Sequence, residues 1–244
     1  MRPLLRWLAL VAVAFLALQL FFVARIAMMA VVDPQSTAFE RSEAWRILHA
    51  KGALAWRQQW VPYAEISDHL KRAVIASEDD GYANHDGVDW DALEKAWQKN
   101  SRAEEQAARR AMAGARASAA SPKVVGGSTI TQQLAKNLFL SGERTLLRKA
   151  QELVLTMLLE ALLDKRRILE IYLNSVEWGE GVFGAQAAAQ HYYRKSASKL
   201  GAAEAARLAV LLPRPKYFEK LPHSAYVAGR TGIILARMAD ARLP

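Results

Sequence analysis

The chain has 244 residues, 52% of them hydrophobic, so it is long enough to bury one sizeable core. It contains no cysteine, which excludes disulfide bonds and thiolate metal sites. Its 33 Lys and Arg against 24 Asp and Glu give a net charge of +9, which favours anionic partners such as nucleic acid, anionic lipid or a phosphate-bearing substrate. A generally basic surface without a specific partner explains the charge equally well.

An apolar segment occupies residues 7–32, and its only charged residue is Arg25. A helix of this length crosses a bilayer core of roughly 30 Å, so we predict a transmembrane anchor. Arg2 and Arg6 precede it, and this positive flank places residues 1–6 in the cytoplasm and the remaining chain outside it. A cleaved signal peptide is the alternative, but the apolar run is longer than usual for one and no Ala-x-Ala site closes it. An exported location argues against nucleic acid as a partner.

Residues 33–65 are expected to form a juxtamembrane segment, followed by a globular domain over residues 66–244. At the start of this domain, Ile66, Leu70 and Val74 recur at a spacing of four, which predicts a helix.

Residues 98–122 are rich in Ala, Arg and Ser, and Met112 is their only large apolar residue. Such a segment has almost nothing to bury, so we interpret it as a mobile insertion.

From Thr129 onward the apolar residues recur with helical spacing, and one of the resulting stripes contains Leu147, Val154 and either Met157 or Leu158. No alternating strand pattern and no internal repeat is evident. The predicted fold class is mainly α.

Three segments are candidates for chemistry, and the first is the stretch GGSTITQQLAKN, residues 126–137. Thr129 and Gln132 fit a capping box, so the two glycines lead into a helix N-terminus, whose unpaired N–H groups attract an anion. The predicted helix has a polar face of Gln133, Lys136 and Asn137 opposite an apolar face of Ile130, Leu134 and Leu138. An ordinary amphipathic helix with a flexible start is the alternative, and the spacing does not match a Walker A loop.

The second candidate is a cationic cluster around a carboxylate. Glu152 follows Arg148 by four residues and Lys149 by three, so all three side chains share one helix face, with Arg144 a turn earlier. Such a cluster can hold a multiply charged leaving group, although a solvated face held by ion pairs would have the same spacing.

The third candidate is an acidic run over residues 78–89. It contains Glu78, Asp79, Asp80, His85, Asp86 and Asp89. Its spacing matches neither a calcium loop nor a His-Glu-x-x-His zinc motif. Glu78 falls near a predicted helix C-terminus, where the helix dipole raises the pKa of a carboxyl, as suits a general base. A solvated acidic turn is the alternative.

Two further matches are attributed to chance. Gly179–Gly184 fits the dinucleotide fingerprint G-x-G-x-x-G but follows a helical pattern with no βαβ unit. Ser196–Lys199 fits the Ser-x-x-Lys of penicillin-binding transpeptidases, but no S-D-N or K-T-G motif follows.

Taken in chain order, five motifs resemble those of the family 51 glycosyltransferases that polymerise peptidoglycan, specifically the monofunctional transglycosylases of the bacterial inner membrane. The motifs are ASEDDGYANHDGVD, GGSTITQQLAKNLFL, RKAQE, RRILEIYLNSVEWGEGVFG and RLAVLLPRPKYF. The second is very specific, and the resemblance covers roughly residues 66–237.

This resemblance implies a lysozyme-like, two-lobed helical fold around a cleft near the membrane. It implies lipid II, a disaccharide pentapeptide on undecaprenyl pyrophosphate, as substrate. The growing chain is the donor, and the 4-hydroxyl of lipid II attacks its anomeric carbon with inversion and release of the lipid pyrophosphate.

Site residues follow from the same resemblance. Glu78 matches the catalytic glutamate and is expected to be the general base. Lys136 and Arg144 are the first choices for neutralising the pyrophosphate, with Arg148 and Lys149 in support. Glu152 matches the second essential glutamate, which orients the donor side, holds the cations or helps to bind a divalent metal. Ser128, Gln132, Gln133 and Asn137 are expected to bind substrate.

No cofactor is required by the sequence, although a divalent metal, Mg²⁺ or Mn²⁺, is compatible with it. The expected partners are the membrane, lipid II, the nascent glycan strand and transpeptidases or other wall-synthesis proteins. The chain ends soon after the fifth motif, which leaves no room for a transpeptidase domain. Three features depart from the family. Gln151 replaces a common Lys, so one expected cation at the pyrophosphate is missing. Tyr82 replaces the usual Phe, and the insertion before Gly126 is long.

Two other functions are compatible with parts of the pattern. A lysozyme-like lytic enzyme would cleave the same glycan, but it needs a carboxylic acid to protonate the glycosidic oxygen and no pyrophosphate site. A catalytically silent membrane scaffold would recruit partners without chemistry.

Overall fold

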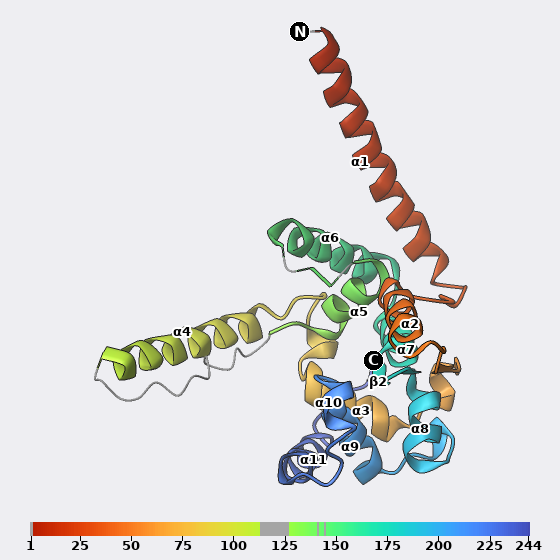
Figure 1. Ribbon diagram of the computed structural model, residues 1–244, viewed down its shortest axis with the longest axis vertical. Helices are drawn as coiled ribbons and strands as arrows, with labels where there is room; N and C mark the ends of the chain where they lie inside the picture. Colours follow the sequence, from red (N-terminus) through yellow and green to blue (C-terminus); the bar gives the residue numbers. More distant parts are fainter. Residues whose placement is uncertain (1, 113–126, 141, 144) are drawn as a thin grey trace.

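A computed structural model of the chain describes residues 2–112, 127–140, 142–143 and 145–244 (Figure 1). The described residues are mainly α-helical, which confirms the predicted fold class. Their α-helices are α1 (Arg2–Met28), α2 (Ala38–Lys51), α3 (Asp68–Glu78), α4 (Trp90–Met112), α5 (Ile130–Phe139), α6 (Leu146–Leu162), α7 (Lys165–Ser175), α8 (Ala185–Tyr193), α9 (Ala202–Leu211), α10 (Pro215–Phe218) and α11 (Ala225–Arg237). Short 3-10 turns lie at Tyr63–Glu65, Tyr82–Asn84 and Ala197–Lys199, and short strands at β1 (Arg57–Gln58), β2 (Glu177–Gly179) and β3 (Val182–Phe183).

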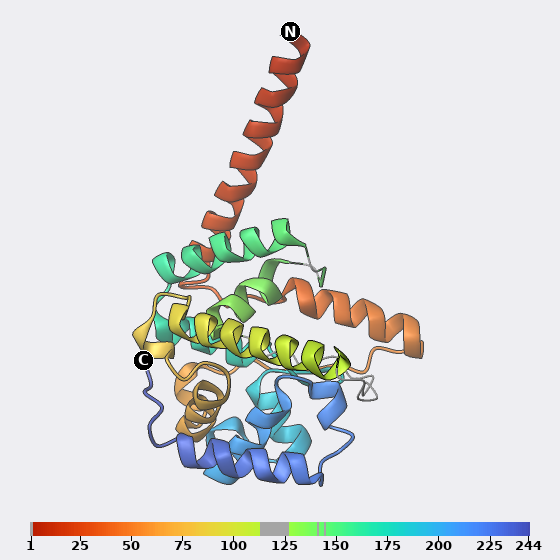
Figure 2. The same cartoon turned by 90° about the vertical axis from the view of Figure 1, so that its left-hand side faces the viewer.

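Helix α1 extends away from the rest of the molecule (Figures 1 and 2), and its length and apolar composition suffice to cross a membrane. Its last turns pack on the body, where Phe22 and Ile26 are buried and the Phe22 ring meets that of Phe139 at 5.3 Å between centroids. The Arg167 guanidinium donates a hydrogen bond of 2.8 Å to the backbone oxygen of Met29. The end of the apolar helix is therefore fixed to the rest of the molecule.

The other helices form two groups (Figure 1). In one group α3 packs against α9 and α11, and Leu70 and Val74 of α3 are fully buried, as their spacing predicts. In the other group α5 packs against α2, α6 and α7 through an apolar face that includes the buried Leu134. The two groups meet where α3 ends and α5 begins, because Asp79 accepts a hydrogen bond from the backbone of Ile130 at 2.9 Å.

The apolar stripe predicted on α6 does not face the core. Leu147 is 82% exposed, Val154 and Met157 are also exposed and Leu158 is half-buried, whereas Leu155 and Leu159 on the other face are buried. Helix α6 lies beside the lower part of α1 (Figure 2), so its apolar outer face lies on the side of the anchor. Periodicity identifies an apolar face but does not decide whether protein or another medium covers it.

The strands correct the expectation that the chain lacks them. Arg57 pairs with Val182 in parallel, and β2 pairs with β3 as an antiparallel hairpin. The glycines of the apparent dinucleotide fingerprint belong to this hairpin: Gly181 has φ +75°, and a Cβ there would lie 2.2 Å from the backbone oxygen of Ala55. Strands of two or three residues are too short to show an alternating pattern, so they could not be predicted from periodicity.

Helix α4 projects from the body as an arm (Figure 1) and includes residues 98–112 of the expected insertion. The rest of the insertion, residues 113–122, lies outside the described residues. Its mobility stays a prediction.

Candidate functional site

The segment before α5 contains the predicted capping box. The backbone N–H of Gln132 donates to Thr129 Oγ1 at 3.2 Å, and the backbone N–H of Thr129 donates to Gln132 Oε1 at 3.1 Å. The helix N-terminus does attract an anion, but it is an internal one: Asp79 Oδ2 accepts from the N–H of Ile130. A substrate phosphate would therefore have to bind elsewhere on α5.

Asp79 is the centre of a junction that positions the end of α3. His85 Nδ1 accepts a hydrogen bond of 3.1 Å from the backbone N–H of Gly87, so Nε2 carries the hydrogen that it donates to Asp79 Oδ1 at 2.8 Å. The Thr129 hydroxyl donates to the backbone oxygen of Gly87 at 2.6 Å. These contacts hold the neighbouring Glu78 between α3 and α5. Sequence reasoning did not identify this positioning role of Asp79 and His85.

Glu78 is the last residue of α3, as predicted, and it is half-buried. Burial raises the pKa of its carboxyl above the ordinary value, an effect that the charge of Asp79 reinforces and that the Gln133 amide and the Arg230 guanidinium oppose. The predicted direction is confirmed, but the main cause is burial, whereas the sequence suggested the helix dipole.

Gln133 connects Glu78 to the core. Its Nε2 donates to Glu78 Oε2 at 3.0 Å, while its Oε1 accepts from the hydroxyl of Tyr172 at 3.0 Å. Burial raises the pKa of Tyr172 well above 10, so this hydroxyl keeps its proton and fixes the orientation of the amide. The nitrogen side of the amide therefore faces the carboxylate.

The cationic cluster on α6 has the predicted arrangement. Glu152 is only 3% exposed, and its two oxygens contact Arg148 Nη1 at 2.7 Å and Lys149 Nζ at 2.5 Å. The Nε of Arg148 is buried and has no hydrogen-bond acceptor among the described residues. The Glu152 carboxylate thus holds both cations in position, and the Nε–H group of Arg148 still has no acceptor among the described residues.

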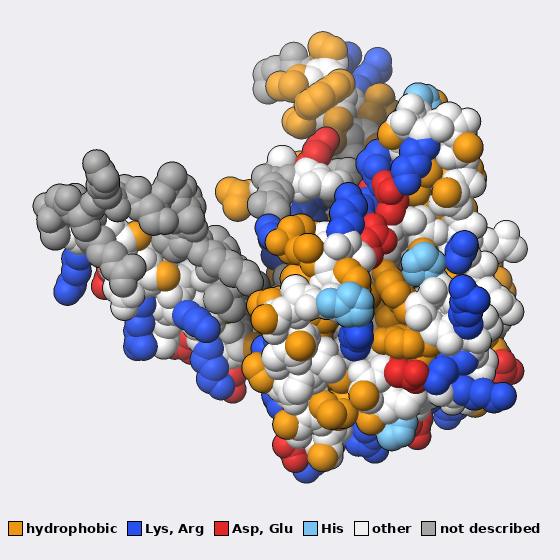
Figure 3. All heavy atoms as spheres, turned by 60° about the horizontal axis from the view of Figure 1, so that its bottom comes forward, with side chains coloured by type: hydrophobic (Ala, Val, Ile, Leu, Met, Phe, Trp, Pro, Cys, Tyr) orange, Lys and Arg blue, Asp and Glu red, His pale blue; other side chains and the backbone are white. Residues whose placement is uncertain are grey.

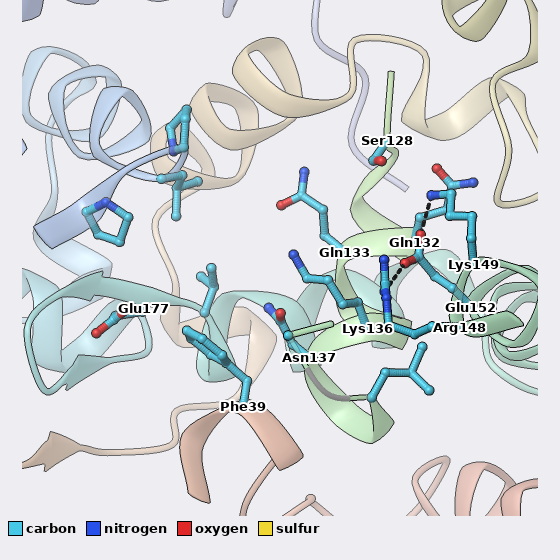
Figure 4. Close-up of a pocket in the computed structure, with 16 residues that line it drawn as sticks. Phe39, Ser128, Gln132, Gln133, Lys136, Asn137, Arg148, Lys149, Glu152 and Glu177 are labelled. Atoms are coloured by element: carbon cyan, nitrogen blue, oxygen red, sulfur yellow. Dashed lines mark hydrogen bonds and ion pairs between the residues drawn. The ribbon is translucent and has the colours of Figure 1, made fainter. Parts of the chain in front are cut away.

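A cavity of about 460 Å³ lies between α5, α6 and the segment before α10 (Figure 4). It brings together eight of the ten predicted site residues: Ser128, Gln132, Gln133, Lys136, Asn137, Arg148, Lys149 and Glu152. Glu78 lines an adjoining cavity of about 320 Å³, and Ser128 lines both. Arg144 lies outside the described residues.

Sequence reasoning missed Glu177, which lies on the side of the cavity away from Glu152 (Figure 4). It is buried, and its Oε1 has no hydrogen-bond partner in the described part of the chain. Burial raises the pKa of Glu177 to about 7, although the Lys216 ammonium at 3.6 Å opposes the shift. The available signal was a carboxylate inside the fourth motif, between Val176 and Trp178.

Two departures from the family motifs have structural explanations. Gln151, where a Lys is common, donates to Gln19 of α1 at 3.4 Å and is absent from the cavity lining. The expectation that its replacement removes a cation from the pyrophosphate is therefore wrong for this chain, because position 151 faces the anchor. Tyr82, where Phe is usual, donates its hydroxyl to the backbone oxygen of Lys165 at 2.7 Å.

The described residues do not fit a metal site at Glu152. They contain no group of three or more His, Asp or Glu side chains that could hold an ion. Both oxygens of Glu152 are already engaged by cations, whereas Mg²⁺ and Mn²⁺ need carboxylate oxygens that are available to them.

Comparison with known proteins gives the family of the chain. Residues 47–239 match the model of a family described as Transglycosylase. A biosynthetic peptidoglycan transglycosylase of Burkholderia thailandensis is 54% identical over 100% of this chain and 90% of its own length, and the same values hold for one of Burkholderia pseudomallei. A third, from Paraburkholderia xenovorans, is 50% identical over 98% of this chain and 94% of its own length.

Proposed function

The chain belongs to the transglycosylase family and is a peptidoglycan glycosyltransferase, and from this premise we propose that it polymerises lipid II with the growing glycan strand as donor. One observation carries the proposal. Glu78, which forms no ion pair within 4.0 Å among the described residues, lies in a cavity that adjoins a second cavity with a cationic cluster, and Ser128 lines both. A candidate general base and a candidate site for the leaving group therefore lie on either side of Ser128.

Glu78 acts as the general base. The 4-hydroxyl of the incoming sugar is a weak nucleophile, so its proton must be accepted as the new bond to the anomeric carbon forms. The raised pKa of Glu78 brings its basicity closer to neutral pH, and the Gln133 amide stabilises its charged form before the reaction. Attack from this side inverts the anomeric carbon.

The cations of α5 and α6 receive the departing pyrophosphate. Its oxygen gains negative charge as the glycosidic bond breaks, and Lys136, Arg148 and Lys149 line the cavity where that charge would develop. The unused Nε of Arg148 is a donor for a phosphate oxygen. Arg144 joins this group by its motif position. Glu152 keeps the cations in place.

Amide and hydroxyl side chains align the donor. Ser128, Gln132 and Asn137 line the same cavity and offer hydrogen bonds to the sugar or the diphosphate. The reaction written here needs no resident cofactor, and no step in it passes through a metal ion.

The apolar helix α1 anchors the enzyme in the inner membrane. With Arg2 and Arg6 at its start, the N-terminus lies in the cytoplasm and the catalytic body in the periplasm, where transpeptidases cross-link the product. We assign no transpeptidase activity to this chain.

Two substrates separate this function from a lytic enzyme. The full-length protein in detergent micelles should convert lipid II into glycan polymer and leave isolated glycan strands intact. Cleavage of strands without polymer formation would overturn the proposal, and the absence of both reactions would favour a scaffold.

A further inference from the structure

The cavity that contains Glu78 has a wall that the mechanism above does not use. This wall is the N-terminal part of α4, where Ala92, Lys95, Ala96 and Lys99 line the cavity at helical spacing. Ala96 is buried, whereas both lysines are exposed. The two alanines leave space for a ligand, and the two long cationic side chains can reach over it.

The packing of Gly127 holds this wall in place. A Cβ atom at residue 127 would lie 3.2 Å from the Cα of Leu93 and 3.3 Å from the Cβ of Ala96, so the backbone before α5 rests directly on α4. At the start of the helix, Asp89 accepts a hydrogen bond of 2.8 Å from the backbone N–H of Ala92. The placement of the wall beside the catalytic base is therefore part of the fold.

The lysines of this wall differ from the other charges around the cavity. Asp79 is engaged in the junction described above, and Asp80 pairs with Arg237 at 2.8 Å. Within the described ranges, Lys95 and Lys99 have no carboxylate oxygen within 4.0 Å. Lys and Arg side chains follow the α4 arm in the space-filling view (Figure 3). Two uncompensated positive charges thus lie at the edge of the cavity that holds the base.

The proposed reaction brings two lipid diphosphates into one cleft. The diphosphate of the donor leaves, but that of the incoming lipid II stays attached throughout the reaction. The cations of α5 and α6 cannot neutralise both without bringing the two anions together, which is unfavourable. A second anion site is therefore needed on the side from which the 4-hydroxyl reaches Glu78.

We propose that Lys95 and Lys99 bind the diphosphate of the incoming lipid II and so position its 4-hydroxyl at Glu78, an inference that rests on the proposed function. The two lysines are one helical turn apart, with Cβ atoms about 5–6 Å from each other, so both ammonium groups can reach one diphosphate. Arg237 on α11 lines the same cavity but already pairs with Asp80, so the two lysines are the cations available to the diphosphate. The carboxylates of the pentapeptide have similar charge, and the test separates them from the diphosphate.

The test uses substrates that can react in one role only. Lipid II methylated at the 4-hydroxyl serves only as donor, and lipid II with a methylene group in place of the anomeric oxygen serves only as acceptor. With the full-length enzyme, the double variant Lys95→Gln/Lys99→Gln should raise the acceptor KM about 10-fold while donor KM and kcat stay within about twofold. The matched control is Arg109→Gln, which removes one positive charge about 15 Å further along α4 than Lys99.

Two further acceptors identify the anion that the lysines bind. An acceptor without phosphates should be used equally poorly by the wild type and the double variant, whereas an acceptor without the peptide should keep the 10-fold difference. Equal losses with all acceptors, or a raised donor KM, would overturn this inference but leave the proposed function intact. If the difference disappears with the peptide-free acceptor, the lysines bind peptide carboxylates and the diphosphate assignment is wrong. If the wild type transfers no donor to any acceptor, the proposed function fails as well.

Discussion

Glu78 and Glu152 line adjoining parts of one cleft, but the two carboxylates have different neighbours. Glu78 accepts a hydrogen bond of 3.0 Å from the neutral amide of Gln133, and burial raises its pKa. Glu152 is buried too, but each of its oxygens contacts a cation, from Arg148 and Lys149.

This difference assigns separate roles to two residues of the same type. A carboxylate that contacts a neutral donor can accept a proton during the reaction, whereas one held between two cations would have to break both ion pairs to do so. The surroundings therefore favour Glu78 as the base and Glu152 as the residue that orders the cations around the leaving group.

The largest expected effect comes from removing the base. Glu78→Gln keeps the shape of the side chain but cannot accept the proton, so kcat/KM for lipid II polymerisation should fall by about 10²–10⁴-fold. Glu65→Gln, at an exposed glutamate outside the cleft lining, is the matched control and should leave the rate unchanged. A rate for Glu78→Gln within a few-fold of the wild type would remove Glu78 from this role.

Glu152→Gln should have a smaller effect of a different kind. Arg148 and Lys149 lose their shared carboxylate and are no longer held in position, so kcat/KM should fall by about 10–10²-fold. The pH dependence is the discriminating measurement, because the acidic limb of kcat/KM should stay where it is in the wild type. Disappearance of that limb would show that Glu152, rather than Glu78, is the base.

Gln133→Leu tests the environment of the base. The amide favours the charged form of Glu78, so its removal should raise the pKa of Glu78 further and move the acidic limb of kcat/KM to higher pH. Since the base must be deprotonated, the variant should lose more activity on the acidic limb than at the optimum pH. A uniform loss across the pH range would mean that Gln133 only contacts substrate.

Tyr172→Phe should have the smallest effect. It removes the hydroxyl that orients Gln133 without changing the shape of the ring, so the acidic limb should move in the same direction by less than in Gln133→Leu. The loss in kcat/KM should be about two- to five-fold, since an orienting hydrogen bond contributes about 1 kcal/mol. The double variant should show no shift beyond that of Gln133→Leu alone, and additive shifts would indicate independent actions.

The helix at the centre of the site could be predicted almost completely. Local spacing placed the capping pair Thr129 and Gln132 at its start and Leu134 on its buried face, and the structure confirms all three. It also placed Arg148 and Glu152 on one face of the following helix, where they form an ion pair. Interactions between residues three or four positions apart depend on helix geometry alone.

Other parts of the site depended on contacts between distant residues. The carboxylate at the start of α5 comes from Asp79, 51 residues earlier. Glu177 reaches the cavity through a hairpin whose strands are too short to show a period. Gln151 donates a hydrogen bond to Gln19 of the anchor helix. Its place beside the cationic residues of the RKAQE motif did not predict this contact.

Local sequence patterns were sufficient to predict the helical class, the apolar anchor segment, the polar face of α5 and the spacing of the cations around Glu152, because each depends on residues within a few turns of one another. The folded structure was needed to show that the stripe containing Leu147 and Val154 lies on the outer face of α6, that burial rather than the helix dipole dominates the pKa of Glu78, and that Asp79 occupies the helix terminus where a phosphate was expected. These outcomes depend on which surfaces meet when the chain folds, and the free energy of burying a group is set by all its neighbours in space.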